Sequence, residues 1–241
     1  MKSFMDLDLS PLHNNIGASL LMIMYFKIAI ELICWINFRF KGPSRHMYHA
    51  FLTSLVIFWP LFDTSEWSWR LHAIVPAVMA SRLLFKGGIR KDPNDLDVQN
   101  LSLSSSPSDL LFGPLQIACV MVWLGLYEFM SVEAAIIAGA AFGDGIAPII
   151  GARYGRHMFT FPMGNAKTME GSVVGVFLGT VAGSYTYLYM MGIPLLPLRM
   201  ILAYAGIASV VEATAPMNLD NIVIPVVLHF SIDRVQDLLP A

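Results

Sequence analysis

The stretch FGDGIAPIIGARYG, residues 142–155, places the carboxylate of Asp144 inside an apolar run of small residues. The run at 132–150 has the length and character of a transmembrane helix. A carboxylate at membrane depth normally faces a partner or a water-filled cavity, since it is costly to bury alone. Pro148 lacks the N–H that would bond to the carbonyl of residue 144, which predicts a weakened helix there. The stretch therefore predicts a membrane helix that carries either a polar site or an interhelical hydrogen bond.

The composition places the whole chain in a membrane. Of its 241 residues, 56% are hydrophobic and only 13% are charged, whereas soluble domains average roughly 25% charged. Spanning segments should be helical, because lipid offers no partners to backbone groups. The sequence predicts an all-α, polytopic integral membrane helix bundle with about seven transmembrane helices, within a range of six to eight. The expected spans are residues 17–37, 47–62, 68–85, 111–130, 132–150, 171–191 and 198–215, with a shorter eighth or re-entrant piece at 222–232.

Basic residues predict the orientation of these spans. They follow the first, third and fifth spans, and the intervening connections are acidic or nearly neutral. The positive-inside rule then places residues 1–16 outside the cytosol and the loops near 38–46, 86–110, 151–170 and 216–221 in the cytoplasm. Residues 17–237 are expected to form one transmembrane domain whose site lies on the cytoplasmic face. The serine-containing loop at 86–110 is either a flexible segment or a structured lid.

A second acid–proline pattern resembles the first. DGIAP at 144–148 is matched by EATAP at 212–216, so that Glu212 corresponds to Asp144. Either the match is chance, or two broken helices aim two carboxylates at one site. Carboxylate and carbonyl oxygens are the ligands that Mg²⁺ prefers.

The segment GNAKTMEGS, residues 164–172, leads into a helix with glycine at 171, 175, 179 and 183. Lys167, Thr168 and the N–H groups near Gly171 and Ser172 make a cationic, donor-rich helix start that suits phosphate. The alternative is a basic anchor that only sets topology. The glycine ridge predicts close helix contact, within one chain or between two, which leaves a homodimer open.

Two further polar pairs lie near the expected cytoplasmic face. Arg45 and His49 are four residues apart and therefore share one helix face; they either anchor lipid headgroups or hold a phosphate. Asp220 and Asn221 precede the last apolar piece, where such residues are most often a helix cap.

The order and spacing of these motifs are informative together. Arg45-x3-His49 is followed by GDG, five residues and GARYG, then by KTMEGS, VE, and DN with a proline four residues later. Across residues 41–230 this series resembles the CTP-dependent lipid-alcohol kinases, which include phytol, dolichol and polyprenol kinases and CTP-dependent diacylglycerol kinases. The resemblance implies transfer of the γ-phosphoryl group of CTP, with Mg²⁺, to phytol, a polyprenol or dolichol, farnesol or diacylglycerol.

The resemblance also implies roles for individual residues. Asp144, Glu212 and Asp220 are implied as the catalytic and Mg²⁺-binding carboxylates. The implied nucleotide- and phosphate-binding residues are Arg45, His49, Arg153, Lys167, Thr168, Glu170, Gly171, Ser172 and Asn221. The expected partners are the nucleotide, the lipid alcohol and membrane lipids, with no nucleic acid. An endoplasmic reticulum, plastid or bacterial inner membrane would each suit such an enzyme.

Two features depart from the family pattern. His46 stands where many members have a basic residue, and LSLSSSPSD at 101–109 lacks an arginine common there. Two other functions stay open. A phosphatidate cytidylyltransferase also uses CTP, but its Gly-rich Asp-Arg-x-Asp signature is missing and SIDRVQD is only a faint echo. A small ion or anion transporter without catalysis would also combine broken helices with charges in the membrane.

Overall fold

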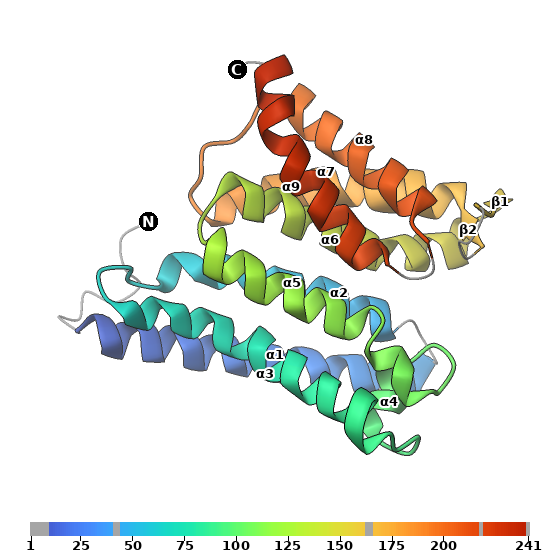
Figure 1. Ribbon diagram of the computed structural model, residues 1–241, viewed down its shortest axis with the longest axis horizontal. Helices are drawn as coiled ribbons and strands as arrows, with labels where there is room; N and C mark the ends of the chain where they lie inside the picture. Colours follow the sequence, from blue (N-terminus) through green and yellow to red (C-terminus); the bar gives the residue numbers. More distant parts are fainter. Residues whose placement is uncertain (1–9, 41–43, 162–165, 217–218, 240–241) are drawn as a thin grey trace.

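The computed structural model describes residues 10–40, 44–161, 166–216 and 219–239. It is almost entirely helical, in two groups of helices (Figure 1). The first group contains α1 (Pro11–Phe40), α2 (Ser44–Thr53), α3 (Ile74–Leu84), α4 (Leu96–Leu101) and α5 (Pro114–Tyr127). The second contains α6 (Val132–Tyr154), α7 (Gly179–Met190), α8 (Leu198–Thr214) and α9 (Asp220–Leu238). The expected all-α membrane fold is confirmed.

Short segments with other helical geometry extend several of these helices. The 3₁₀ segments are η1 (Ser54–Leu61), η2 (Trp67–Ala73) and η4 (Pro107–Leu110). The wider π-helical segments are η3 (Phe85–Arg90) and η5 (Glu170–Leu178). The expected spans at 47–62 and 68–85 are therefore each a helix joined to a 3₁₀ segment, with Pro60 inside η1. Because 3₁₀ geometry rises more per residue than an α-helix, both segments cover more length than their residue count suggests.

Four helical segments among the described residues are long and apolar enough to cross a membrane: Pro11–Ile36, Pro107–Tyr127, Val132–Tyr154 and Glu170–Met190. The predicted number of seven is not confirmed. The other expected spans are helical but shorter or more polar; α8 has 17 residues, and α9 carries charged residues at both ends. The short piece expected at 222–232 lies inside α9, a continuous helix of 19 residues.

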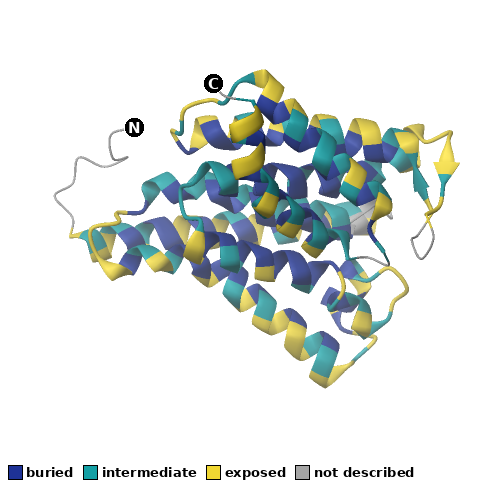
Figure 2. Ribbon diagram, turned by 45° about the horizontal axis from the view of Figure 1, so that its top comes forward, coloured by how far each residue is buried: buried dark blue, intermediate teal, exposed yellow. Residues whose placement is uncertain are grey.

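Apolar side chains on the outside of the bundle match a lipid environment. α1 exposes large apolar side chains, among them Leu20, Met24, Ile28 and Trp35. Only 28% of its most apolar 18-residue stretch is buried. Figure 2 shows exposed residues on the outer helix faces and buried residues on the faces turned inward. α1 also begins at Pro11, six residues before its expected start, so part of the segment predicted at 1–16 is helical; residues 1–9 lie outside the described residues.

The glycine ridge packs within this chain, against α6. A Cβ atom at Gly175 would lie 2.4 Å from Ala147 Cα, and one at Gly179 would lie 2.6 Å from Gly143 Cα. Such contacts exist only because neither helix has side chains in the way. The ridge brings η5 and α7 against the middle of α6, where every residue from Ala134 to Ala141 is buried.

The helix that was expected to be weakened at Pro148 is not broken there. α6 continues through Pro148 to Tyr154, so the proline removes one hydrogen bond without ending the helix. The close contact of Gly175 with Ala147 supports the helix at this point. EATAP at 212–216 instead lies at a helix end, since α8 stops at Thr214 and Ala215 is extended. Asp144 therefore lies inside a continuous helix, whereas Glu212 lies in the last turn of one.

The polar connections are also structured. After α6, strands β1 (Met158–Phe159) and β2 (Lys167–Thr168) pair antiparallel, with Met158 opposite Thr168. This hairpin returns the chain to η5 and lies beside the end of α6 (Figure 1), where a Cβ atom at Gly151 would lie 2.6 Å from Thr168 Oγ1. The 86–110 segment contains η3, α4 and η4, which favours the structured alternative over a flexible one.

Candidate metal and phosphate site

A cavity of about 340 Å³ lies where α2, α6, the start of η5 and the junction of α8 with α9 meet. These segments are far apart in the sequence, yet their polar ends are at one end of the bundle (Figure 1). All but two of the residues implied by the resemblance line the cavity. They are Arg45, His49, Asp144, Lys167, Thr168, Gly171, Ser172, Glu212, Asp220 and Asn221.

Three carboxylates from three helices converge in this cavity. One oxygen each from Asp144 of α6, Glu212 of α8 and Asp220 of α9 lie within 4.8 Å of one another. Asp144 and Glu212 are buried, and Glu212 Oε2 has no hydrogen-bond partner. Three carboxylates held this close repel one another unless cations lie between them. Their oxygens are the hard ligands that suit Mg²⁺, so the residues present fit such an ion.

Lys167 supplies one of these cations. Its Nζ lies 2.9 Å from Glu212 Oε1 and 3.3 Å from Asp220 Oδ2, and it also donates to the backbone carbonyl of Glu212. Burial lowers the pKa of Lys167, but the charges of Glu212 and Asp220 outweigh burial and raise the pKa above its ordinary value. The ammonium therefore stays charged beside the carboxylates.

Arg45 and His49 form the wall of the cavity on α2. Both side chains are buried, and Arg45 donates from Nη2 to the carbonyl of Phe112 at 2.7 Å. Nε of Arg45 and both ring nitrogens of His49 have no hydrogen-bond partner in the described part of the chain. Nδ1 of His49 lies 3.9 Å from Asp144 Oδ2. Buried polar atoms without partners are rare, and here they line a cavity that could hold a polar ligand.

The start of η5 forms the opposite wall. Gly171 donates its N–H to Thr168 Oγ1 at 3.1 Å, and the hydroxyl of Ser172 is buried. Gly171 approaches α6 so closely that a Cβ atom would lie 3.0 Å from the carbonyl oxygen of Ala147. π-Helical turns are rare and frequently occur at functional sites.

Asn221 orients Asp220. The backbone N–H and the side-chain amide of Asn221 both donate to Asp220 Oδ1, at 3.1 and 3.2 Å. The Oδ2 atom of Asp220 is the one that contacts Lys167. Neither residue is the N-cap of α9, which is Leu219 and has no side-chain capping bond. The expected cap is therefore not formed.

Two of the implied residues are not brought into the cavity. Arg153 is exposed, with its guanidinium carbon 5.8 Å from the ring centre of Tyr154. Glu170 pairs instead with His157, its Oε1 lying 2.8 Å from Nδ1. Gly151 and Ala152 of α6 line the cavity. Arg153 follows them, and the rotation of about 100° per residue along a helix turns its side chain away from the cavity.

The cavity is also lined by residues that the sequence analysis gave no site role, and His46 and Leu103 are two of them. His46 directly follows Arg45, at the position where the family pattern carries a basic residue, so the motif held a signal for it. Leu103 lies in the serine-rich segment, and one leucine there gives no sequence signal of a site.

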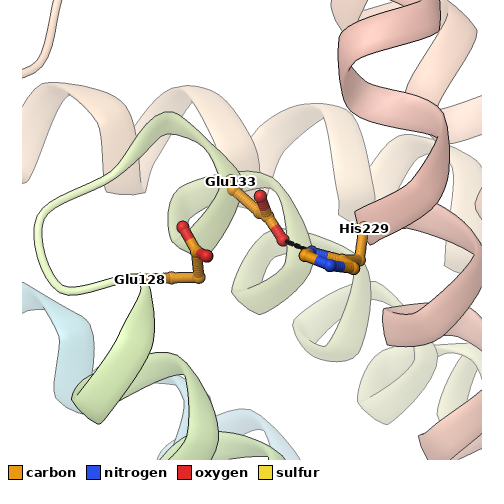
Figure 3. Close-up of side chains that lie close together, drawn as sticks. All are labelled: Glu128, Glu133 and His229. Atoms are coloured by element: carbon orange, nitrogen blue, oxygen red, sulfur yellow. Dashed lines mark hydrogen bonds and ion pairs between the residues drawn. The ribbon is translucent and has the colours of Figure 1, made fainter.

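A separate cluster lies near the other end of α6. Glu128, Glu133 and His229 come together there, and the ring of His229 bonds to the carboxylate of Glu133 (Figure 3). Glu133 is eleven residues before Asp144, about 16 Å along the helix. The cluster therefore belongs to the packing of α6 on α9 and not to the cavity.

Comparison with known proteins adds to this geometry. The chain is 28% identical over 178 residues to probable phytol kinase 2, chloroplastic, of Oryza sativa subsp. japonica, covering 73% of this chain and 56% of the relative. It is 31% identical over 157 residues to probable phytol kinase 1, chloroplastic, of Glycine max, covering 63% and 51%. It is 28% identical over 138 residues to farnesol kinase, chloroplastic, of Arabidopsis thaliana, covering 54% and 42%. No family model and no solved structure matches the chain.

The fold and cavity define an all-α, membrane-type helix bundle with a polar site at one end. The resemblance to the lipid-alcohol kinases is confirmed, since the chain is a homologue of proteins named phytol kinase and farnesol kinase. The chain spans about half the length of the curated relatives it matches.

Proposed function

We propose that this protein is a membrane kinase that transfers the γ-phosphoryl group of CTP to the hydroxyl of an isoprenoid or related lipid alcohol. The observation that carries the proposal is the convergence of Asp144, Glu212 and Asp220 with Lys167 in one cavity. Phosphoryl transfer depends on positioning and on charge neutralisation more than on covalent chemistry, and this is what such a set of residues can supply. The names of the relatives support an isoprenoid alcohol such as phytol or farnesol as the acceptor.

The charge balance of the cavity supports a divalent cation. Three carboxylates share the cavity with two basic side chains, Lys167 and Arg45. Asp144, Glu212 and Asp220 would hold Mg²⁺, which would neutralise charge on the phosphates and on the departing group. With the ion in place the cavity would become net positive, a suitable environment for a triphosphate.

The chain's own residues would then hold the nucleotide. Lys167, Arg45 and the start of η5 present cationic groups and N–H donors toward the phosphates. The alcohol oxygen would attack the γ-phosphorus, the bond to the β–γ bridging oxygen would break, and CDP would leave. The hydroxyl proton would pass to an oxygen of one of the three carboxylates. CTP as the donor rests on the family resemblance.

The membrane setting fits this reaction. The exposed apolar faces of the helices suit lipid. The cavity is lined by the start of α2 and by the junction of α8 with α9, where a hydroxyl at the membrane boundary could reach it. The distribution of basic residues supports a cytoplasmic position for this part of the bundle. Of the three membranes considered from the sequence, a plastid membrane has the support of relatives named as chloroplastic.

The test is transfer of label from γ-labelled CTP to lipid. Purified protein in liposomes with Mg²⁺ is given phytol, farnesol, a polyprenol, dolichol or diacylglycerol, beside an Asp144→Asn variant. Label in one alcohol that is lost in the variant would support the proposal and identify the substrate. If a folded, nucleotide-binding protein released pyrophosphate in place of CDP, the cytidylyltransferase would replace the kinase. If the protein bound no nucleotide, the transporter would be favoured.

A further inference from the structure

Residues 102–113, which we call the wall segment, join α4 to α5 and contribute to the cavity at two points. Leu103 lines the cavity, and the carbonyl of Phe112 accepts the hydrogen bond of Arg45. The proposed function assigns this segment no role. Its contacts show how it is held in place.

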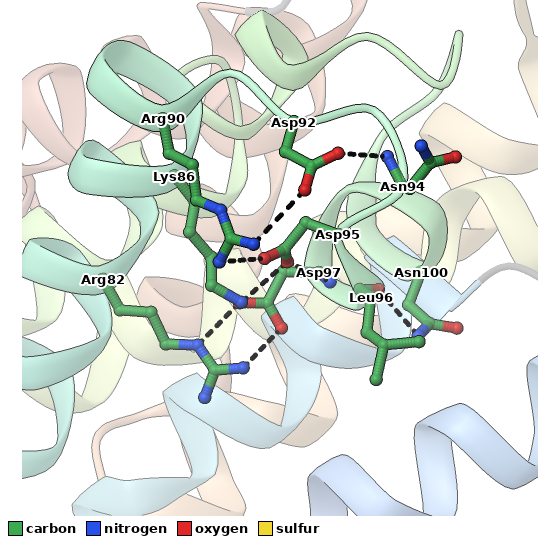
Figure 4. A network of polar contacts seen from close by, with 9 residues as sticks. All are labelled: Arg82, Lys86, Arg90, Asp92, Asn94, Asp95, Leu96, Asp97 and Asn100. Carbon is green, nitrogen blue, oxygen red and sulfur yellow. Dashed lines mark hydrogen bonds and ion pairs between the residues drawn. The ribbon is translucent and has the colours of Figure 1, made fainter.

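An ion-pair cluster fixes the chain just before the wall segment (Figure 4). Lys86 Nζ lies 2.7 Å from Asp95 Oδ1 and 2.8 Å from Asp97 Oδ2. Arg82 makes two bonds to Asp97, from Nε at 2.6 Å and from Nη2 at 2.7 Å. Both aspartates are buried, and bidentate pairs of this type are the strongest and most directional. The cluster therefore fixes α4 against α3 and η3.

Asp109 fixes the wall segment itself. Its Oδ2 atom accepts hydrogen bonds from the backbone N–H of Leu103 at 3.0 Å, and from N and Oγ of Ser104 at 2.7 and 2.8 Å. η4, which contains Asp109, packs directly on η3, where a Cβ atom at Gly87 would lie 2.9 Å from the carbonyl oxygen of Pro107. One carboxylate thus holds the backbone that presents Leu103 to the cavity.

The end of the wall segment holds Arg45. Gly113 has φ of 98°, a conformation that favours glycine, and a Cβ atom there would lie 2.1 Å from Arg45 Nη2. With Nη2 bonded to the Phe112 carbonyl, the guanidinium is fixed against residues 112 and 113. Its Nε atom is buried and has no hydrogen-bond partner among the described residues.

We propose that the wall segment is a fixed side of the nucleotide site and that Asp109 is a positioning residue for it. Through this segment Asp109 holds Leu103 against the bound nucleotide and keeps Arg45 aimed at its phosphates. The identity of the ligand in this inference rests on the proposed function. The position of the wall segment rests only on the contacts described above. Loss of Asp109 should weaken nucleotide binding and leave binding of the lipid alcohol unchanged.

A labelling experiment tests the position of the wall segment without any activity. The two native thiols are removed as Cys34→Ser and Cys119→Ser, Leu103→Cys is introduced, and its reaction rate with a maleimide is measured. Mg²⁺ with CTP should slow this reaction several-fold. Adding Asp109→Ala should raise the labelling rate in the absence of nucleotide and should reduce the slowing that CTP causes. Ser108→Ala, which removes only an exposed bond to Ser106, is the matched control and should do neither.

Kinetics test the positioning role. Asp109→Ala should raise the KM for CTP about tenfold, the scale of a lost charge-assisted hydrogen bond, while the KM for the alcohol stays the same. Asp109→Asn keeps an acceptor oxygen and should recover most of the affinity. Equal KM values for CTP in Asp109→Ala and Ser108→Ala would overturn the proposal. If the wild-type protein bound no CTP, the proposed function would fail. Equal labelling rates of Leu103→Cys with and without Asp109→Ala, measured in the absence of nucleotide, would separately contradict the role of Asp109 in holding the wall segment.

Discussion

The ammonium of Lys167 lies 2.9 Å from the carboxylate of Glu212, although 45 residues separate the two in the sequence. The pair joins β2 to the end of α8 and places a positive charge beside the three carboxylates. Lys167 therefore has a structural contact in addition to the phosphate-binding role proposed for it.

Replacing the lysine separates those roles. Lys167→Met leaves the carboxylates without their nearest cation and should destabilise the fold by about 3 kcal/mol, as expected for breaking a buried ion pair. Phosphoryl transfer should fall by about 100-fold or more, since a charge aimed at the transferring group is lost. Thermal unfolding in detergent and labelled transfer would be measured beside Lys91→Met, an exposed lysine in the same protein. Transfer within twofold of the wild type would show that Lys167 does not hold phosphate.

Removal of divalent cations should lower the melting temperature of the wild-type protein. A ligand that binds only the folded state at 100 times its Kd stabilises it by about 2.7 kcal/mol. Asp144→Asn removes one of the proposed ligands and should melt at the same temperature with Mg²⁺ or with EDTA. Asp92→Asn, at an exposed ion pair with Arg90, should keep the full Mg²⁺-dependent shift. A shift that persists in Asp144→Asn would place the ion elsewhere.

Two glycine substitutions should have opposite effects on stability. Gly179→Ala would put a Cβ atom 2.6 Å from Gly143 Cα and should destabilise the bundle by roughly 1–3 kcal/mol, as overpacking does. Gly206 lies inside α8 with nothing within 4 Å of the added atom. Gly206→Ala should therefore stabilise the protein by up to about 1 kcal/mol, because alanine favours the helix. Denaturation of both variants measures the difference, and equal losses would contradict close α6–α7 contact.

The bond between Glu133 and His229 should contribute to stability and not to catalysis. It joins α6 to α9 about 16 Å from Asp144. A double-mutant cycle of Glu133→Gln and His229→Gln should give a coupling energy of roughly 0.5–1 kcal/mol, because the pair is partly exposed. The KM for CTP should stay unchanged in both single variants. A coupling energy of zero, or a large change in KM, would contradict this assignment.

The sequence predicted the helices well, because their apolar runs are long and the glycines mark the close contacts. Asp144 was visible as a carboxylate inside such a run, and Lys167 as a cation at a helix start. Whether a helix continues or ends at a given residue could not be predicted in this way. Whether Pro148 breaks α6 depends on what packs against it, and a single sequence does not contain that packing.

The candidate site was predictable where a motif and its local geometry agree. Arg45 and His49 share a helix face and line the same wall. Arg153 and Glu170 were implied by motif alone, and their side chains turn to Tyr154 and His157 instead. Leu103 lies at the cavity because the fold of the wall segment, held by Asp109, brings it there. No sequence pattern predicts that placement.

The carboxylate set has a consequence for biosynthesis. Its members lie on α6, α8 and α9, and Asp220 is the first residue of α9. A chain still leaving the ribosome has Asp144 in the membrane while Glu212 and Asp220 have not yet been made. The three-carboxylate set is complete only once α9 has been made, so a copy that ends before α9 would lack Asp220 and with it part of the proposed site.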